Sequence, residues 1–231
     1  MGIVSLSWLF GDALARAGQA QLLALGWGWR PLFLASAAGV GLIFLLCLLF
    51  LREQPATQTT ETAVVEEVAV APVPTATGPL PRASYSVAAG AFAFTLVNVT
   101  LSEWLPLYFS QRGLSQGGAA LASGLYPAMG GVSAVAFGYL GDRTNAQGRL
   151  WLLVGGLVIT ALTLAGFLLP LSPLLLVGLA GLATGGPYAW AVGAAALDLG
   201  PKEKAASLNG YLDGTGYLGA VVAGEAVAGL A

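Results

Sequence analysis

The chain has 231 residues, of which 57% are hydrophobic and only 9% are charged. Soluble domains carry about a quarter charged residues, so this composition excludes an ordinary soluble globule and predicts a membrane protein. The net charge of −2, the single cysteine and the lack of histidine argue against nucleic-acid binding, a disulfide framework, a Cys/His metal site and Ser-His or Cys-His catalysis. We therefore expect no cofactor.

The length limits the number of membrane spans. A hydrocarbon core of about 30 Å needs about 20 apolar residues per helix, so the chain has room for roughly seven or eight spans. The apolar segments predict an all-α membrane protein with spans at residues 3–25, 31–51, 85–109, 117–140, 150–169, 174–197 and 205–231. The first residues do not have the pattern of a signal peptide.

The first span contains two charged residues. Asp12 and Arg16 are four residues apart, so they share one face of a helix. One interpretation is an internal ion pair. The other is a substrate or coupling site, because charges inside a membrane normally face a cavity or the interior of a helix bundle.

The character of the sequence changes at residues 52–82. This segment holds five of the twelve prolines of the chain, namely Pro55, Pro72, Pro74, Pro79 and Pro81. It cannot bury enough apolar surface to offset the entropy lost on ordering, so it is interpreted as a disordered linker between residues 1–51 and 83–231.

The third span contains Asn98, Glu103 and Pro106. A proline lacks the backbone N–H of a helix, so Pro106 should kink or end this span and free a carbonyl near Glu103. Glu103 is either solvated near the membrane interface or a carboxylate that faces a cavity.

The fourth span carries Tyr126 and a seam of small residues, which indicates close helix packing; the seam consists of Gly124, Gly130, Gly131 and Ser133. The charged loop after this span contains Gly138, Asp142, Arg143 and Arg149. Asp142 lies at a helix end and could meet the positive N-terminus of a neighbouring helix, as part of a conformational lock. The alternative is a solvated turn with two arginines that orient the chain.

The last two spans flank a short polar segment, residues 198–204, and form a membrane hairpin. Gly185-Gly-Pro187 is expected to unwind or bend the first of them, beside Tyr188 and Trp190, where broken helices often line a cavity. Aromatic packing is the competing explanation. Asp213 lies inside the last span, where a carboxyl group is costly, among glycines that allow close helix contact.

Basic residues predict the orientation of the chain. The linker, the Asp142 loop and the 198–204 segment carry more basic residues than the opposite loops, which hold Arg30 and Arg112. The positive-inside rule therefore places the linker, the loop and the segment in the cytoplasm of a multi-pass protein of the inner (plasma) membrane.

The Gly138-x-x-x-Asp142-Arg143 pattern, with Arg149 after it, resembles the loop between the eighth and ninth helices of the major facilitator superfamily. Three further segments resemble the organophosphate:phosphate antiporters, above all the sugar-phosphate exchangers: Trp104-Leu-Pro-Leu-Tyr108, Gly186-Pro187-Tyr188 and Asp213-Gly-Thr-Gly-Tyr-Leu-Gly219.

The resemblance spans nearly the whole chain. Residues 1–51 correspond to helices five and six of a twelve-helix fold, residues 52–82 to the central linker, and residues 83–231 to helices seven to eleven. Helices one to four and twelve have no counterpart, so the chain resembles a truncated transporter that is not expected to transport alone. A monomer is expected for the full-length form.

The resemblance also bears on the substrate. Asn98 stands where the glycerol-phosphate branch has an arginine that contacts the substrate phosphate, whereas Glu103 keeps a carboxylate. Gly185 replaces a tyrosine. An amide cannot give the bidentate, charged grip of arginine, so phosphate selectivity is in doubt unless Arg16 or helices missing here supply the charge.

We therefore predict part of a secondary transporter that works by alternating access on a small organic or sugar-phosphate-like solute. The predicted solute site comprises Asp12, Arg16, Asn98, Glu103, Tyr126, Tyr188, Trp190 and Asp213, and the predicted lock comprises Gly138, Asp142, Arg143 and Arg149. Transport would be driven by exchange or by a proton carried on Asp213 or Glu103.

Other functions remain open. A proton-coupled carrier of a non-phosphorylated sugar, drug or metabolite is the nearest alternative, and a non-transporting receptor with the same fold is another. An intramembrane aspartyl protease that uses Asp142 and Asp213 is disfavoured, because Asp142 falls in a charged loop and Tyr139 replaces the first glycine of the Gly-x-Gly-Asp pattern typical of such enzymes.

Overall fold

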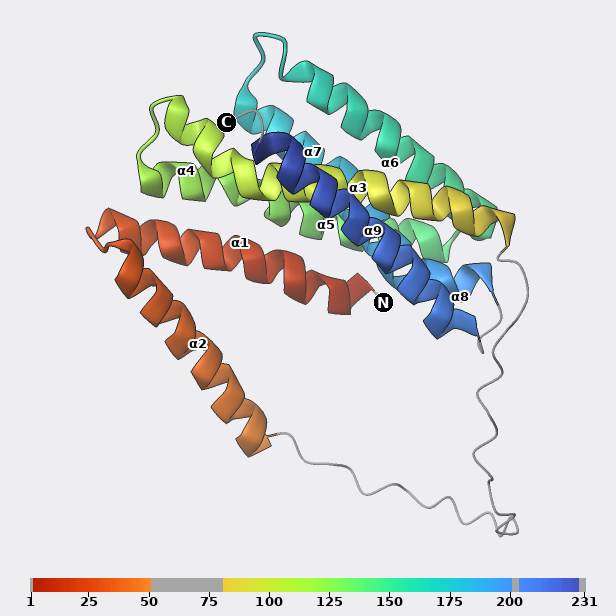
Figure 1. Ribbon diagram of the computed structural model, residues 1–231, viewed down its shortest axis with the longest axis horizontal. Helices are drawn as coiled ribbons and strands as arrows, with labels where there is room; N and C mark the ends of the chain where they lie inside the picture. The colour runs from red at the N-terminus through yellow and green to blue at the C-terminus, as the bar shows by residue number, and fades with distance from the viewer. Residues whose placement is uncertain (1, 51–80, 201–203, 229–231) are drawn as a thin grey trace. The chain divides into compact units, whose positions relative to one another are not determined.

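The computed structural model describes residues 2–50, 81–200 and 204–228 (Figure 1). The chain divides into two compact units, which are considered separately: residues 1–21 with 78–231, and residues 22–77. The predicted linker, residues 52–82, lies almost entirely outside the described part of the chain.

The described residues are helical and contain no strand, which confirms the predicted all-α class. The helices are α1 (Gly2–Ala24), α2 (Trp29–Phe50), α3 (Arg82–Gln111), α4 (Gln116–Ser123), α5 (Leu125–Asp142), α6 (Ala146–Gly166), α7 (Pro173–Ala189), the π-helical turn η1 (Trp190–Ala194), α8 (Ala195–Leu199) and α9 (Ala205–Ala228). Each predicted span has a helical counterpart, with α4 and α5 forming one span and α7, η1 and α8 forming another.

Among the described residues, 5 helical segments are long and apolar enough to cross a membrane: Trp29–Phe50, Arg82–Gln111, Gln116–Asp142, Ala146–Gly166 and Pro173–Leu199. Helices α1 and α9 are also long enough, but they are not among these segments; they carry Asp12, Arg16 and Asp213. The chain is therefore a multi-pass membrane protein.

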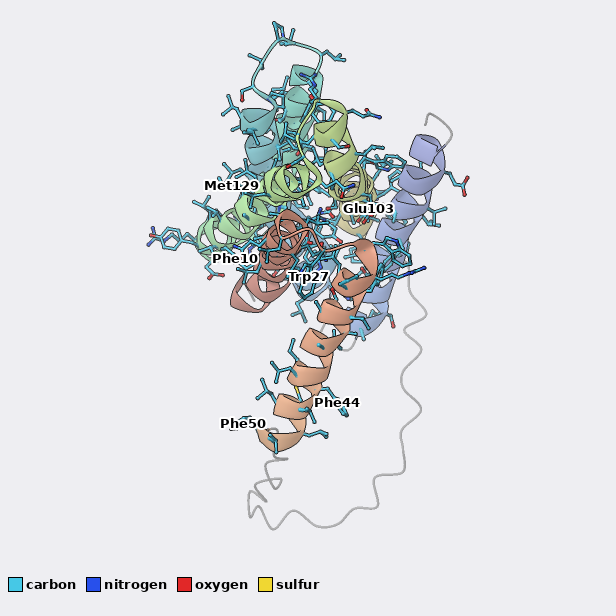
Figure 2. The ribbon with its side chains drawn as sticks, turned by 90° about the vertical axis from the view of Figure 1, so that its left-hand side faces the viewer. Phe10, Trp27, Phe44, Phe50, Glu103 and Met129 are labelled. Atoms are coloured by element: carbon cyan, nitrogen blue, oxygen red, sulfur yellow. The ribbon has the colours of Figure 1, made fainter. Side chains whose placement is uncertain are left out.

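The smaller unit consists of α2 and the turn before it. Gly26 adopts a left-handed backbone conformation, with φ of +82°, in the turn that joins α1 to α2. None of the described side chains of α2 is buried within the chain. Phe44 and Phe50 project from this helix in Figure 2. An apolar helix of 22 residues with this exposure suits a lipid environment.

The larger unit is built on two helix pairs, α5 with α7 and α3 with α9 (Figure 1). Small residues allow the first pair to pack closely. A Cβ atom added to Gly185 of α7 would overlap the backbone of Gly130 in α5, and one added to Gly181 would overlap the Tyr126 carbonyl. Of the predicted seam, Gly130 and Ser133 thus pack α5 against α7, as in other membrane helix pairs, whereas Gly124 and Gly131 face Arg16 and Phe10 of α1.

Prolines interrupt the helices of this unit little. Helix α3 runs through Pro106 without ending, and in the fourth span only Gly124, three residues before Pro127, separates α4 from α5. Helix α7 also continues through Pro187, so of the two expectations for Gly185-Gly-Pro187, to unwind or to bend the helix, the unwinding is wrong. The irregularity follows directly as η1, a π-helical turn that begins at Trp190.

Candidate functional site

Polar side chains from several helices meet in the larger unit around Tyr188. The Tyr126 hydroxyl of α5 lies 3.0 Å from the Thr184 hydroxyl of α7, and the Asn98 side chain of α3 lies near the same Tyr126. Both Asn98 and Tyr126 are buried. These contacts bring residues of α3, α5 and α7 to one place.

Tyr188 extends this group toward α9 and α1. Its side chain neighbours Thr95 of α3 and lies within electrostatic range of Asp213 of α9. The ring of Trp8 in α1 lies against it, with 5.8 Å between the ring centroids. We call this group the Tyr188 cluster; it comprises Trp8, Thr95, Asn98, Tyr126, Thr184, Tyr188 and Asp213. The predicted solute-site residues Asn98, Tyr126, Tyr188 and Asp213 all belong to it.

Two other predicted solute-site residues lie elsewhere. Trp190 is buried against Phe137, with 6.2 Å between the ring centroids, and its indole N–H donates to Asp198 instead of facing the Tyr188 cluster. Glu103, labelled in Figure 2, is an exposed side chain of α3. The structure therefore gathers part of the predicted set and separates the rest.

Asp12 and Arg16 form the ion pair that the spacing allowed, with 3.0 Å between Arg16 Nε and Asp12 Oδ1. Arg16 Nη1 also donates to the Ser102 carbonyl of α3, at 3.2 Å, and to the Ser123 hydroxyl of α4, at 3.4 Å. The Ser102 carbonyl is the one that Pro106, four residues later, leaves without a helical N–H partner. This is the free carbonyl expected near Glu103.

A cavity of about 260 Å³ lies at the C-terminal end of α5, beside the Asp142 loop. Gly138, Gly141, Asp142 and Arg149 line one side of it, and Gly186, Trp190 and Asp198 line the other. The Asp142 side chain is exposed, and Arg143 lies over the ring of Tyr139, with 4.0 Å between its Cζ and the ring centroid. All the predicted lock residues are thus at this end.

Asp198 joins the loop to the π-helical turn. It forms an ion pair with Arg149, whose Nε also donates to the Gly141 carbonyl at 3.0 Å. The same Asp198 oxygen accepts the Trp190 indole N–H at 2.8 Å. The side chains of Arg149 and Asp198 are each about one-fifth exposed, so the pair is shielded from most of the solvent.

Sequence reasoning missed Trp8, Thr95, Thr184 and Asp198. Asp198 gave no distinct signal, because the π-helical turn between it and Trp190 changes which helix face each residue occupies. The threonines gave no distinct signal, since each hydroxyl also donates to the carbonyl four residues earlier, as is common in apolar helices.

Among the described residues, no group of His, Cys, Asp and Glu side chains could hold a metal ion. The Tyr188 cluster offers hydrogen-bonding groups, aromatic rings and the carboxyl group of Asp213.

Comparison with known proteins gives the family. No curated protein and no solved structure matches the chain significantly. Residues 1–224 match the family model of the Major Facilitator Superfamily. The match covers nearly the entire chain, and a family of membrane transporters agrees with the membrane-spanning helices. The chain therefore belongs to the Major Facilitator Superfamily of membrane transporters.

Proposed function

We propose that this chain carries the solute site of a secondary transporter of the inner (plasma) membrane that works by alternating access. The observation that carries the proposal is the Tyr188 cluster, in which polar groups from α3, α5 and α7 meet inside a membrane-spanning unit, with Asp213 of α9 within electrostatic range. Polar groups at membrane depth are costly and commonly mark a solute path.

The chemistry of the cluster favours a solute that is not phosphorylated. Asn98, Tyr126 and Tyr188 offer amide and hydroxyl groups, which suit the hydroxyls of a sugar or a similar metabolite. Trp8 adds an aromatic surface beside Tyr188. The carboxyl group of Asp213 lies within electrostatic range of Tyr188, and in its ionised form it would repel a phosphate group.

Arg16 does not offset this charge readily. Its Nε is engaged by Asp12, and its Nη1 by Ser102 and Ser123. A phosphate would have to displace these partners to gain a bidentate contact. Of the two alternatives left open by the sequence, we therefore propose a non-phosphorylated solute ahead of a sugar phosphate.

The Asp142 loop is proposed as the conformational lock of the same transporter. The ion pair of Arg149 with Asp198 ties the start of α6 to the end of α8, and Gly138 and Asp142 line the cavity between these elements. Arg143 stacks on Tyr139 on the exposed side of the loop. Release of the Arg149–Asp198 pair would free one helix end from the other during alternation.

Solute binding by the purified chain tests the proposal. A ligand that binds the folded state raises its thermal stability, so the unfolding temperature is measured with neutral sugars, amines, sugar phosphates and inorganic phosphate. We expect stabilisation by a non-phosphorylated compound, and about tenfold weaker binding in Asn98→Ala because a solute hydrogen bond is lost.

Thr215→Ala is the matched control, because Thr215 lies on α9 but outside the cluster, where its hydroxyl donates to the Tyr211 carbonyl at 2.8 Å. This variant should bind as the parent chain does. Stabilisation by phosphate compounds alone would overturn the proposed solute class. Equal binding by the parent chain and Asn98→Ala would remove the cluster as the solute site.

A further inference from the structure

The sequence contains one pattern that the solute site and the lock do not use. Ser102 and Ser123 each stand four residues before a proline, Pro106 in α3 and Pro127 near the start of α5. Since a proline has no N–H to donate to the carbonyl four residues earlier, both serines mark points where a membrane helix is weakened. In the fourth span α4 and α5 are separated there by the single residue Gly124, whose backbone stays in the right-handed helical region.

A single side chain from α1 contacts both weak points. Arg16 Nη1 donates to the carbonyl oxygen of Ser102 at 3.2 Å and to the hydroxyl oxygen of Ser123 at 3.4 Å. Asp12 holds the guanidinium from the previous turn of α1, at 3.0 Å from Nε. The Arg16 side chain is 17% exposed, so its charge is largely removed from solvent and depends on these partners.

The contacts of Arg16 lie on one side of the proposed solute site. Ser102 lies one helical turn, about 6 Å, beyond Asn98 toward the loop that joins α3 to α4. Ser123 lies three residues before Tyr126, on the same side. The contacts of Arg16 therefore stand between the Tyr188 cluster and that loop.

We propose that Arg16 is a gating residue that closes the solute path between the Tyr188 cluster and the α3–α4 loop, an inference that rests on the proposed transport function. Arg16 with its acceptors on Ser102 and Ser123 forms the Arg16 latch. When the latch is made, α1 is held on the proline-weakened points of α3 and α4. When it is released, α3 and the α4–α5 segment bend at these points and open the path.

Thiol labelling from one side of the membrane tests the latch. Cys47 is replaced by serine, Asn98→Cys is introduced, and the full chain is reconstituted in vesicles. A membrane-impermeant maleimide is then applied from the side of the α3–α4 loop. Arg16→Gln should raise the labelling rate about tenfold or more, because a hydrogen bond from a charged donor is lost. Arg16→Lys keeps the charge and should raise it less.

Arg112→Gln is the matched control. This arginine lies at the end of α3, over the Tyr108 ring with 5.0 Å from Cζ to the centroid, and makes no part of the latch. It should leave the labelling rate unchanged. Pro106→Ala restores an N–H for the Ser102 carbonyl, so the effect of Arg16→Gln should be smaller in that background.

A cross-link provides a test that does not depend on the folding of Arg16→Gln. The Arg16 Cβ lies 3.5 Å from the position of a Cβ at residue 124, which is within the range for a disulfide. Oxidation of the Arg16→Cys/Gly124→Cys variant should stop labelling of residue 98 from the α3–α4 side, and reduction should restore it.

The outcomes separate the latch from the transport proposal. If residue 98 reacts but neither Arg16→Gln nor the cross-link changes its rate, the latch is overturned while the solute site stands. If residue 98 is unreactive from both sides in every variant, the solute path itself is refuted, and the latch falls with it.

Discussion

The Trp190 indole N–H donates a 2.8 Å hydrogen bond to Oδ2 of Asp198 across the π-helical turn η1. The same oxygen accepts from Arg149 at the start of α6. One carboxylate thus links the irregular part of the sixth predicted span to the Asp142 loop. A change at η1 that moves Trp190 would therefore shift Asp198 and disturb its ion pair with Arg149, which we propose as part of the lock.

Replacement of Asp198 by asparagine should therefore lower the stability of the protein. The amide introduced by Asp198→Asn would keep an acceptor for Trp190 but would remove the charge that pairs with Arg149. We expect a loss of about 1–2 kcal/mol in the free energy of unfolding, measured by denaturant titration in detergent. Arg143→Gln, which removes only an exposed stacking contact, should cost less. Equal losses in the two variants would contradict a special role for the Arg149–Asp198 pair.

The close packing of α5 against α7 predicts that substitutions of two glycines have different effects on stability. In Gly185→Ala the new methyl group would overlap the backbone of Gly130, so the helices must separate. We expect a loss of about 1–3 kcal/mol or more, as for other overpacked interiors. Gly155→Ala in α6 has nothing within 4 Å of the added atom and should change stability little. The check is the free energy of unfolding of both variants under the same conditions.

The orientation of the chain can be tested at two loop positions. Gln147 near the start of α6 and Gln111 at the end of α3 are both exposed. In the Cys47→Ser background, a cysteine at 147 should react with an impermeant reagent only in inside-out vesicles, and a cysteine at 111 only in right-side-out vesicles. The reverse pattern would mean that the basic loops are not cytoplasmic.

The energy source of transport gives a prediction for Asp213. If Asp213 carries a coupled proton, Asp213→Asn should abolish uptake driven by a pH gradient and leave solute exchange intact, because only the driven process needs proton release. The measurement compares gradient-driven uptake with solute exchange in vesicles that contain the protein. Loss of exchange as well would assign Asp213 to solute binding, and no loss of either would exclude both roles.

Much of the helical architecture could be predicted from the sequence. Apolar segments of about 20 residues are required by the thickness of a bilayer, so the spans were recognisable from composition alone. The free carbonyl near Glu103 was also predictable, because Pro106 has no N–H. That Arg16 supplies the missing donor was not, since it depends on how α1 packs against α3.

The irregular geometry was harder to predict. Gly185-Gly-Pro187 suggested unwinding, yet the glycines serve the close contact with α5, and the irregularity lies one turn later at Trp190. Tyr188 and Trp190 are two residues apart and so lie on opposite faces of the helix, with Trp190 toward Asp198 and Tyr188 in the cluster. A single π-helical turn shifts the helix face, and no local sequence rule determines where it forms.

The central claim is that the Tyr188 cluster lies on a solute path. It is tested most directly by thiol labelling at positions 98, 188 and 213, each replaced by cysteine in the Cys47→Ser background, with and without the stabilising solute. Val158→Cys on the exposed apolar face of α6 is the control. We predict that the three cluster positions react with water-soluble reagents and that solute slows the reaction, whereas position 158 does not react. Cluster positions as unreactive as position 158 in every condition would contradict the account.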